Sequence, residues 1–71
     1  MKLDIRDIVL TSFYKRLYEI IRYNDNLTLG EIDDKLKYYF DNEVIDYVIE
    51  LGVYHKFILK AQKEADEDKR R

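Results

Sequence analysis

Hydrophobic residues recur every three or four positions through most of the chain. In residues 4–23 they are Ile5, Val9, Leu10, Phe13, Leu17, Ile20 and Ile21. Shorter sets follow: Leu29, Ile32, Leu36, Tyr39 and Phe40 in residues 28–40, then Val44, Ile45, Val48 and Leu51 in residues 42–51. This spacing places each set on one face of an α-helix. A helix cannot bury its own apolar face, so the pattern predicts an all-α fold with a compact three-helix core.

Polar residues at the edges of these segments indicate where the helices begin and end. Thr28 and Glu31 have the spacing of a capping box, in which each side chain accepts from the other residue's backbone N–H. Asp4 and Asp41 are the expected N-caps of the other two helices. Gly52 can adopt the left-handed conformation that ends a helix, so the third helix is predicted to stop at residue 51.

The segment from residue 53 onward has two interpretations. Apolar side chains alternate over residues 53–59 as in a strand, but a helix would place another set on one face: Tyr54, Phe57, Ile58, Ala61 and Ala65. A hairpin would need a turn signal such as Asn-Gly, and none follows. We therefore expect a fourth helix over residues 53–67. Residues 1–67 would form a single domain, and residues 68–71 a frayed, charged end.

The composition excludes several kinds of site and indicates in which compartment the protein works. The 71 residues include no cysteine, which excludes disulfides, thiolate zinc sites and cysteine nucleophiles. No apolar run approaches the ~20 residues that a membrane span requires, so no membrane association is expected. Acidic residues precede any apolar run at the N-terminus, which is not the pattern of a signal peptide. We expect a protein of the cytoplasm, either that of its own cell or that of a host cell.

The centre of the chain resembles helix-turn-helix proteins of the winged-helix kind. Residues 27–36, Leu-Thr-Leu-Gly-Glu-Ile-Asp-Asp-Lys-Leu, are similar to the positioning helix of that family. Residues 42–51 then take the place of the recognition helix, and Leu51-Gly52-Val53 is similar to the link into the wing. The resemblance covers about residues 27–54 and implies a DNA-binding transcriptional regulator. The wing hairpin itself is not readable in the sequence.

The segment in the place of the recognition helix is acidic on its predicted outer side. The side chains expected there are those of Glu43, Asp46, Tyr47 and Glu50. Affinity for DNA comes largely from Lys and Arg that neutralise phosphates, and three carboxylates would oppose it. If the chain binds DNA, another surface must do so. The candidate residues for that alternative are Lys35, Lys37, Lys56, Lys60 and Lys63.

Aromatic residues are abundant, with seven tyrosines and three phenylalanines. Tyr14 and Tyr18 lie one helical turn apart, beyond the edge of the apolar face, and Tyr38 points away from its helix's face. Tyrosines are common at half-buried domain edges, but they also anchor protein interfaces. The predicted partner-binding residues are therefore Tyr14, Tyr18, Tyr38, Glu43, Asp46, Tyr47 and Glu50.

Residues that could support catalysis or metal binding are isolated. His55 is the only histidine and has no cysteine or second histidine to act with. Asp33 and Asp34 are adjacent on a helix and diverge by about 100°, so they cannot converge on one ion unaided. Ser12 has no nucleophile motif around it. We expect no enzymatic activity, no metal, no cofactor and no small-molecule substrate.

These observations lead to two hypotheses about function. The first is a small non-enzymatic regulator, of adaptor or inhibitor type, that binds a protein; by analogy, such small proteins often come from phages, viruses or plasmids. The alternative is the DNA-binding regulator that the resemblance implies. The apolar face of the fourth helix either caps the core or pairs with a copy, and we expect a homodimer. Its interface would be Tyr54, Phe57, Ile58 and Ala61.

Overall fold

The computed structural model describes residues 5–24 and 26–70, which form four α-helices and, within these ranges, no strand. They are α1 (Ile5–Tyr23), α2 (Leu29–Tyr39), α3 (Asn42–Glu50) and α4 (Tyr54–Lys69). The all-α prediction is confirmed. Asp4, the predicted first N-cap, lies outside the described residues. No helix in this part of the chain combines the length and apolar character needed to cross a membrane.

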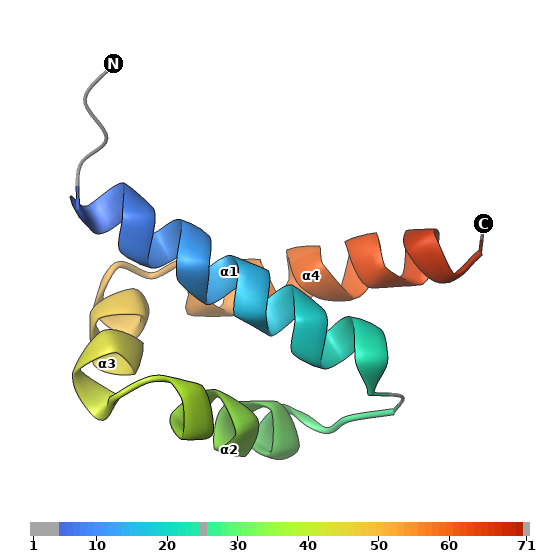
Figure 1. The fold of residues 1–71 in the computed structure, drawn as a ribbon, viewed down its shortest axis with the longest axis horizontal. Coiled ribbons are helices and arrows are strands. Elements are labelled where there is room, and N and C mark those ends of the chain that lie inside the picture. Colours follow the sequence, from blue (N-terminus) through green and yellow to red (C-terminus); the bar gives the residue numbers. More distant parts are fainter. Residues whose placement is uncertain (1–4, 25, 71) are drawn as a thin grey trace.

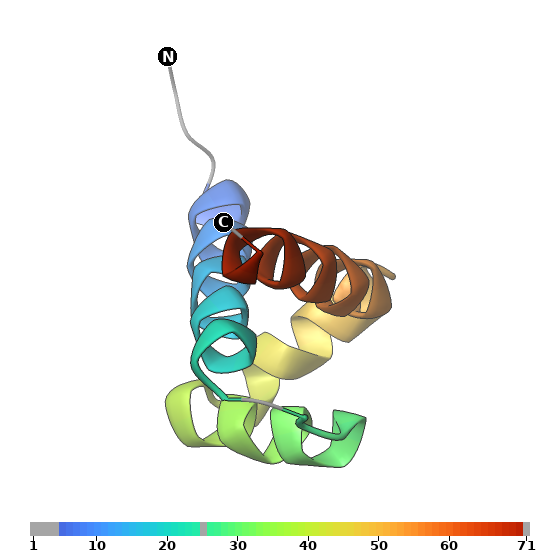
Figure 2. The same cartoon turned by 90° about the vertical axis from the view of Figure 1, so that its right-hand side faces the viewer.

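The helices pack around α1 (Figures 1 and 2). α1 crosses α4 and the two run in the same direction, while α2 runs back along another side of α1. α3 links α2 to α4 at the end of the fold where α1 begins. The contact between α1 and α4 is the most extensive, followed by that of α1 with α2. We call the contact between α1 and α4 the seam.

The core lies where the predicted apolar faces meet. Its buried side chains are Phe13, Leu17, Ile20, Ile32, Leu36, Ile45, Val48, Ile58 and Ala61. The prediction is wrong at the ends of the apolar faces, where four residues expected in the core are exposed: Ile5, Leu29, Tyr39 and Leu51. The first two lie in the opening turn of their helices and the last two at or beyond the closing turn. Periodicity identifies the buried side of a helix, but not how far along its length the neighbours extend.

Helix boundaries follow local chemistry with one exception. The Thr28 hydroxyl accepts from the Glu31 amide at 3.2 Å, and the Glu31 carboxylate accepts from the Thr28 amide at 3.2 Å, which confirms the capping box. Gly52 has a φ of 74°, as predicted for the end of α3. The exception is Asp41, which occupies the N-cap position of α3 but makes no side-chain capping bond.

α4 is one continuous helix, so the strand interpretation of residues 53–60 is wrong. The end predicted for the fourth helix, residue 67, is too early, because α4 continues to Lys69, and the Asp68 carboxylate accepts from the Tyr18 hydroxyl. A tertiary hydrogen bond of this kind holds a final helical turn that its own sequence would leave loose.

The apolar face of α4 caps the core. Ile58 and Ala61 are buried, and Tyr54 and Phe57 are half-buried and pack against the core cluster. The four residues predicted as a dimer interface are therefore already covered within one chain. The sequence allowed this face either to cap the core or to pair with a second copy, and in the structure it caps the core.

Candidate protein-binding surfaces

Three carboxylates form a row on the outer side of α3. Glu43, Asp46 and Glu50 are separated by three and four residues, which places them on one side of the helix. All three are exposed, and Ile49 beside them is 50% exposed. No ion pair joins any of the three to another residue that the structure describes. We call these three residues the acidic stripe.

The acidic stripe opposes the stability of its own helix. Like charges three and four residues apart repel one another, and α3 contains no Lys or Arg to offset them. The helix dipole adds no net penalty, because it favours the anion of Glu43 in the first turn and disfavours that of Glu50 in the last turn. Each effect is a few tenths of a kcal/mol on a surface helix. The repulsion between neighbouring carboxylates is therefore a small cost to α3.

Tyr47 does not lie on the exposed side of α3, where the sequence placed it. Its side chain is half-buried, and its hydroxyl is fully buried with no hydrogen-bond partner among the described residues. The position follows from geometry, because Tyr47 adjoins the buried Val48 and lies at the boundary between the apolar and the polar side of the helix. Tyr47 is thus removed from the predicted partner-binding set.

Tyr14 and Tyr18 are likewise used inside the fold, at the seam. The Tyr14 hydroxyl donates to the Glu64 carboxylate at 2.6 Å, and the Tyr18 hydroxyl donates to Asp68. The Tyr14 ring meets Phe57 edge-on at 5.4 Å between centroids. Burial, together with the neighbouring Glu64 carboxylate, raises the pKa of Tyr14. These two tyrosines therefore join α1 to α4, and their hydroxyls are used within the fold.

A third tyrosine forms the same kind of bond between α4 and α2. The Tyr54 hydroxyl donates to Asp33 at 2.9 Å, and Asp33 also pairs with Lys37 at 3.1 Å. Both contacts favour the ionised carboxylate and lower the pKa of Asp33. Asp33 therefore has a structural role, and the charge of Lys37 is partly offset within the fold.

The lysines considered for DNA binding are spread over two helices. Lys35 and Lys37 belong to α2, while Lys56, Lys60 and Lys63 belong to α4. Two of the five are already engaged: Lys37 pairs with Asp33, and Lys60 lies over the Tyr14 ring at 5.2 Å. α2 and α4 lie on different sides of α1 (Figure 2). These lysines do not form one continuous cationic surface.

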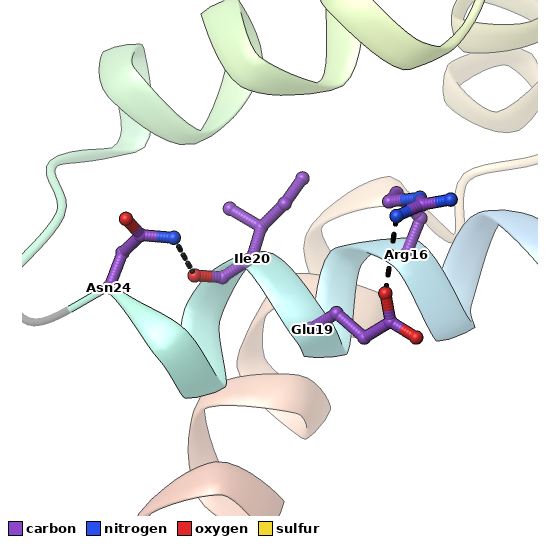
Figure 3. Close-up of polar contacts among 4 residues, drawn as sticks. All are labelled: Arg16, Glu19, Ile20 and Asn24. Atoms are coloured by element: carbon purple, nitrogen blue, oxygen red, sulfur yellow. Dashed lines mark hydrogen bonds and ion pairs between the residues drawn. The ribbon is translucent and has the colours of Figure 1, made fainter.

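A groove between α1 and α2 is the second surface of interest. Two adjoining hollows share Tyr39, and together they are lined by Ser12, Lys15, Arg16, Glu19, Ile20, Asn24, Asp34, Lys35, Tyr38, Tyr39 and Phe40. We call this surface the α1–α2 groove. Figure 3 shows its α1 side, where Ile20 and Arg16 extend toward α2 and Arg16 pairs with Glu19 at 3.2 Å.

Exposed aromatic rings give the α1–α2 groove its character. Tyr38 is 84% exposed and Tyr39 is 49% exposed, and the two rings meet edge-on at 5.1 Å. The Arg16 guanidinium lies over the Tyr39 ring at 4.4 Å from its centroid. The exposure of Tyr38 agrees with its predicted direction. Sequence reasoning missed Tyr39 and Arg16, although three consecutive aromatics at residues 38–40 signal that one helix cannot bury them all.

The His, Asp and Glu side chains are possible metal ligands. No three side chains of His, Asp or Glu there gather closely enough to hold a metal ion. His55 is exposed and meets Tyr54 edge-on at 5.8 Å. In comparisons with family models, curated proteins and solved structures, nothing matches this chain. Any function must therefore be argued from the surfaces themselves.

Proposed function

We propose that this chain is a non-enzymatic binding protein, of adaptor or inhibitor type, that docks a basic surface of another protein on the acidic stripe of α3. The observation that carries the proposal is the row of three exposed carboxylates, Glu43, Asp46 and Glu50, without a counter-charge among the described residues. Such a row destabilises its own helix, and a partner with Lys or Arg side chains would relieve that cost.

The neighbouring apolar side chains supply what charge alone does not. Complementary charge accelerates encounter and selects the partner, while affinity depends on buried anchors at the centre of the interface. Ile49 is 50% exposed beside the stripe, and Leu51 follows the end of α3 at 45% exposed. The expected partner therefore combines basic side chains with an apolar pocket for Ile49.

DNA binding remains the alternative hypothesis. α2 and α3 are consecutive and in contact, as in a helix-turn-helix pair. The helix in the recognition position, however, presents carboxylates, and the candidate lysines are divided between α2 and α4. Because phosphate neutralisation dominates affinity for DNA, this arrangement favours a protein partner.

The proposal can be tested by affinity capture with matched baits. The test variant is E43Q/D46N/E50Q, which removes the three stripe charges and keeps side-chain size. The control variant is D7N/D66N/E67Q, which removes three exposed carboxylates from α1 and α4 that belong to neither the acidic stripe nor the α1–α2 groove. Each bait is incubated with a lysate of the organism that encodes the chain, with and without nuclease, and the retained proteins are identified by mass spectrometry.

We expect a protein that wild type and control both retain, that nuclease treatment does not release, and that the stripe variant loses. Its association should slow as salt increases, because steering between exposed charges is screened. Retention of the same protein by the stripe variant would contradict the proposal. Sequence-specific binding of duplex DNA by the wild type at nanomolar concentration would establish the alternative.

A further inference from the structure

The α1–α2 groove carries three cationic side chains, Lys15, Arg16 and Lys35, and two carboxylates, Glu19 and Asp34, around an apolar floor, and Glu19 is paired with Arg16. Lys15 on α1 and Lys35 on α2 stand on its two sides, and no ion pair joins either lysine to another described residue. Ile20 and the half-exposed Tyr39 form the apolar part. Such a groove suits an occupant that carries several carboxylates and one apolar side chain.

α3 has this combination on its outer side. Glu43 and Glu50 are seven residues apart, so the acidic stripe is about 10 Å long at 1.5 Å per residue. Ile49 projects beside it and is half-exposed. Lys15 and Lys35 lie on opposite helices of the groove, so a helix placed between them could offer a carboxylate to each. The charges and the apolar anchor of one surface thus complement those of the other.

The geometry points to a second copy of this chain as the occupant: we infer that α3 of one copy docks, through the acidic stripe and Ile49, in the α1–α2 groove of another. This inference rests on the proposed function, since it uses the same stripe. α3 lies at the end of the fold where α1 begins (Figure 1), and within one chain no ion pair joins the acidic stripe to Lys15 or Lys35 among the described residues. The two complementary surfaces are therefore brought together between copies.

An interface between two different surfaces is head-to-tail. A pair joined in this way keeps one free groove and one free acidic stripe, so association can continue into a ring or an open chain. The stripe of each docked copy is covered, and only a terminal copy displays it. A basic partner that binds the stripe would then compete with the groove, and self-association would limit how many stripes are available.

Two variants that each lack one surface provide the test. K15E/K35E reverses the charge of the groove and leaves the stripe intact, while E43Q/D46N/E50Q neutralises the stripe and leaves the groove intact. K56E/K63E is the matched control, because it reverses two exposed lysines of α4 that line neither surface. Far-UV circular dichroism confirms that all are folded. Sedimentation velocity is measured from about 10 μM to 1 mM, a range suited to weak interfaces.

We expect the wild type and the control to associate with increasing concentration, and to dissociate at about 1 M salt because exposed pairs are screened. Each single-surface variant should remain monomeric alone. A 1:1 mixture of the two should form a heterodimer and nothing larger, since only one intact groove and one intact stripe remain. This last result is specific to a head-to-tail interface.

Several results would overturn the inference. A wild type that is monomeric throughout, a mixture that stays monomeric, or a variant that dimerises alone would each do so. Binding of a single-stranded oligonucleotide that is lost in K15E/K35E, with a monomeric wild type, would instead make the groove a nucleic-acid site. None of these outcomes affects capture of a protein by the stripe. Conversely, a wild-type chain that self-associates as expected but captures no protein from the lysate would contradict only the proposed function.

Discussion

The carboxylates at the seam accept hydrogen bonds that join two helices, whereas the carboxylates on α3 are unpaired among the described residues and repel one another. At the seam, Glu64 and Asp68 of α4 accept hydrogen bonds from the hydroxyls of Tyr14 and Tyr18 on α1. On α3, the acidic stripe has no such donor and no counter-charge among the described residues. The same kind of side chain thus joins two helices in one region and repels its neighbours in the other.

The difference separates stability from function in a small protein. A chain of this size has a limited core, and hydrogen bonds to charged acceptors across a packed seam add to it. α3 contributes Ile45 and Val48 to that core, but the carboxylates on its outer side form no ion pair with other described residues. Side chains kept at a cost to the fold are the better candidates for binding, which is why the proposed docking surface is on α3 rather than at the tyrosine-rich seam.

The largest difference between the two regions should appear on truncation of apolar side chains. Leu17 is fully buried between α1 and its neighbours, so Leu17→Ala should lower the free energy of unfolding by about 3 kcal/mol. Ile49→Ala on the outer side of α3 should change it by less than about 0.5 kcal/mol. Urea unfolding followed by circular dichroism measures both. Comparable losses would show that α3 is held as tightly as the seam.

Alkaline pH should weaken the tyrosine-linked contacts. Burial and hydrogen bonds to carboxylates raise the pKa of both Tyr14 and Tyr54 above the ordinary value of 10.0. The folded chain therefore retains these protons where the unfolded chain releases them, so their contribution is complete below pH 10 and is lost as pH rises above it. Urea midpoints measured between pH 8 and about pH 11 should fall.

Phenylalanine substitutions provide the control for the alkaline effect. The decline should be shallower in Y14F/Y54F, which lacks both ionisable hydroxyls. It should be unchanged in Y38F, because Tyr38 is 84% exposed and its hydroxyl has no carboxylate partner among the described residues. An equal slope in wild type and Y14F/Y54F would assign the decline to other groups.

The same substitution at two tyrosines should have opposite effects at neutral pH. Tyr14→Phe removes the donor to Glu64 and should cost about 1 kcal/mol, at the low end for a charged acceptor because the pair is only partly buried. Tyr47→Phe removes a buried hydroxyl that has no partner among the described residues, so it should be neutral or stabilising. Thermal and urea unfolding compare the two. Destabilisation by both would imply that the Tyr47 hydroxyl is hydrogen-bonded in solution.

Features decided within a few residues could be predicted from the sequence. The capping box of Thr28 and Glu31 and the left-handed Gly52 depend on adjacent backbone groups, and both are present. The central residues of each apolar face, such as Phe13 and Ile32, are buried as expected. The exposure of Glu43, Asp46 and Glu50 also followed, because charged residues opposite an apolar face have only solvent to meet.

Features that depend on which helix lies opposite could not be predicted. Tyr14 and Tyr18 lie outside the apolar face of α1, and only the position of α4 shows that Glu64 and Asp68 meet them. The same contact explains why α4 extends past residue 67 and why its apolar face is not free for a dimer. The α1–α2 groove likewise exists only once α2 is placed against α1.

The smallest expected effect is also the most direct test of the contrast between the two sets of carboxylates. E43Q/D46N/E50Q should raise the free energy of unfolding by a few tenths of a kcal/mol, because it removes repulsion along α3, while the loss of the favourable anion of Glu43 in the first turn and of the unfavourable anion of Glu50 in the last turn offset each other. Glu64→Gln should lower it, since a neutral amide accepts more weakly than a carboxylate from the Tyr14 hydroxyl. Added salt should shrink the gain on α3, because exposed charges are screened, and leave more of the loss at the half-buried seam. Paired urea titrations at low and high salt measure the two differences. If both substitutions destabilised the protein, the carboxylates of the acidic stripe would stabilise the fold, and their presence would not need a partner to explain it.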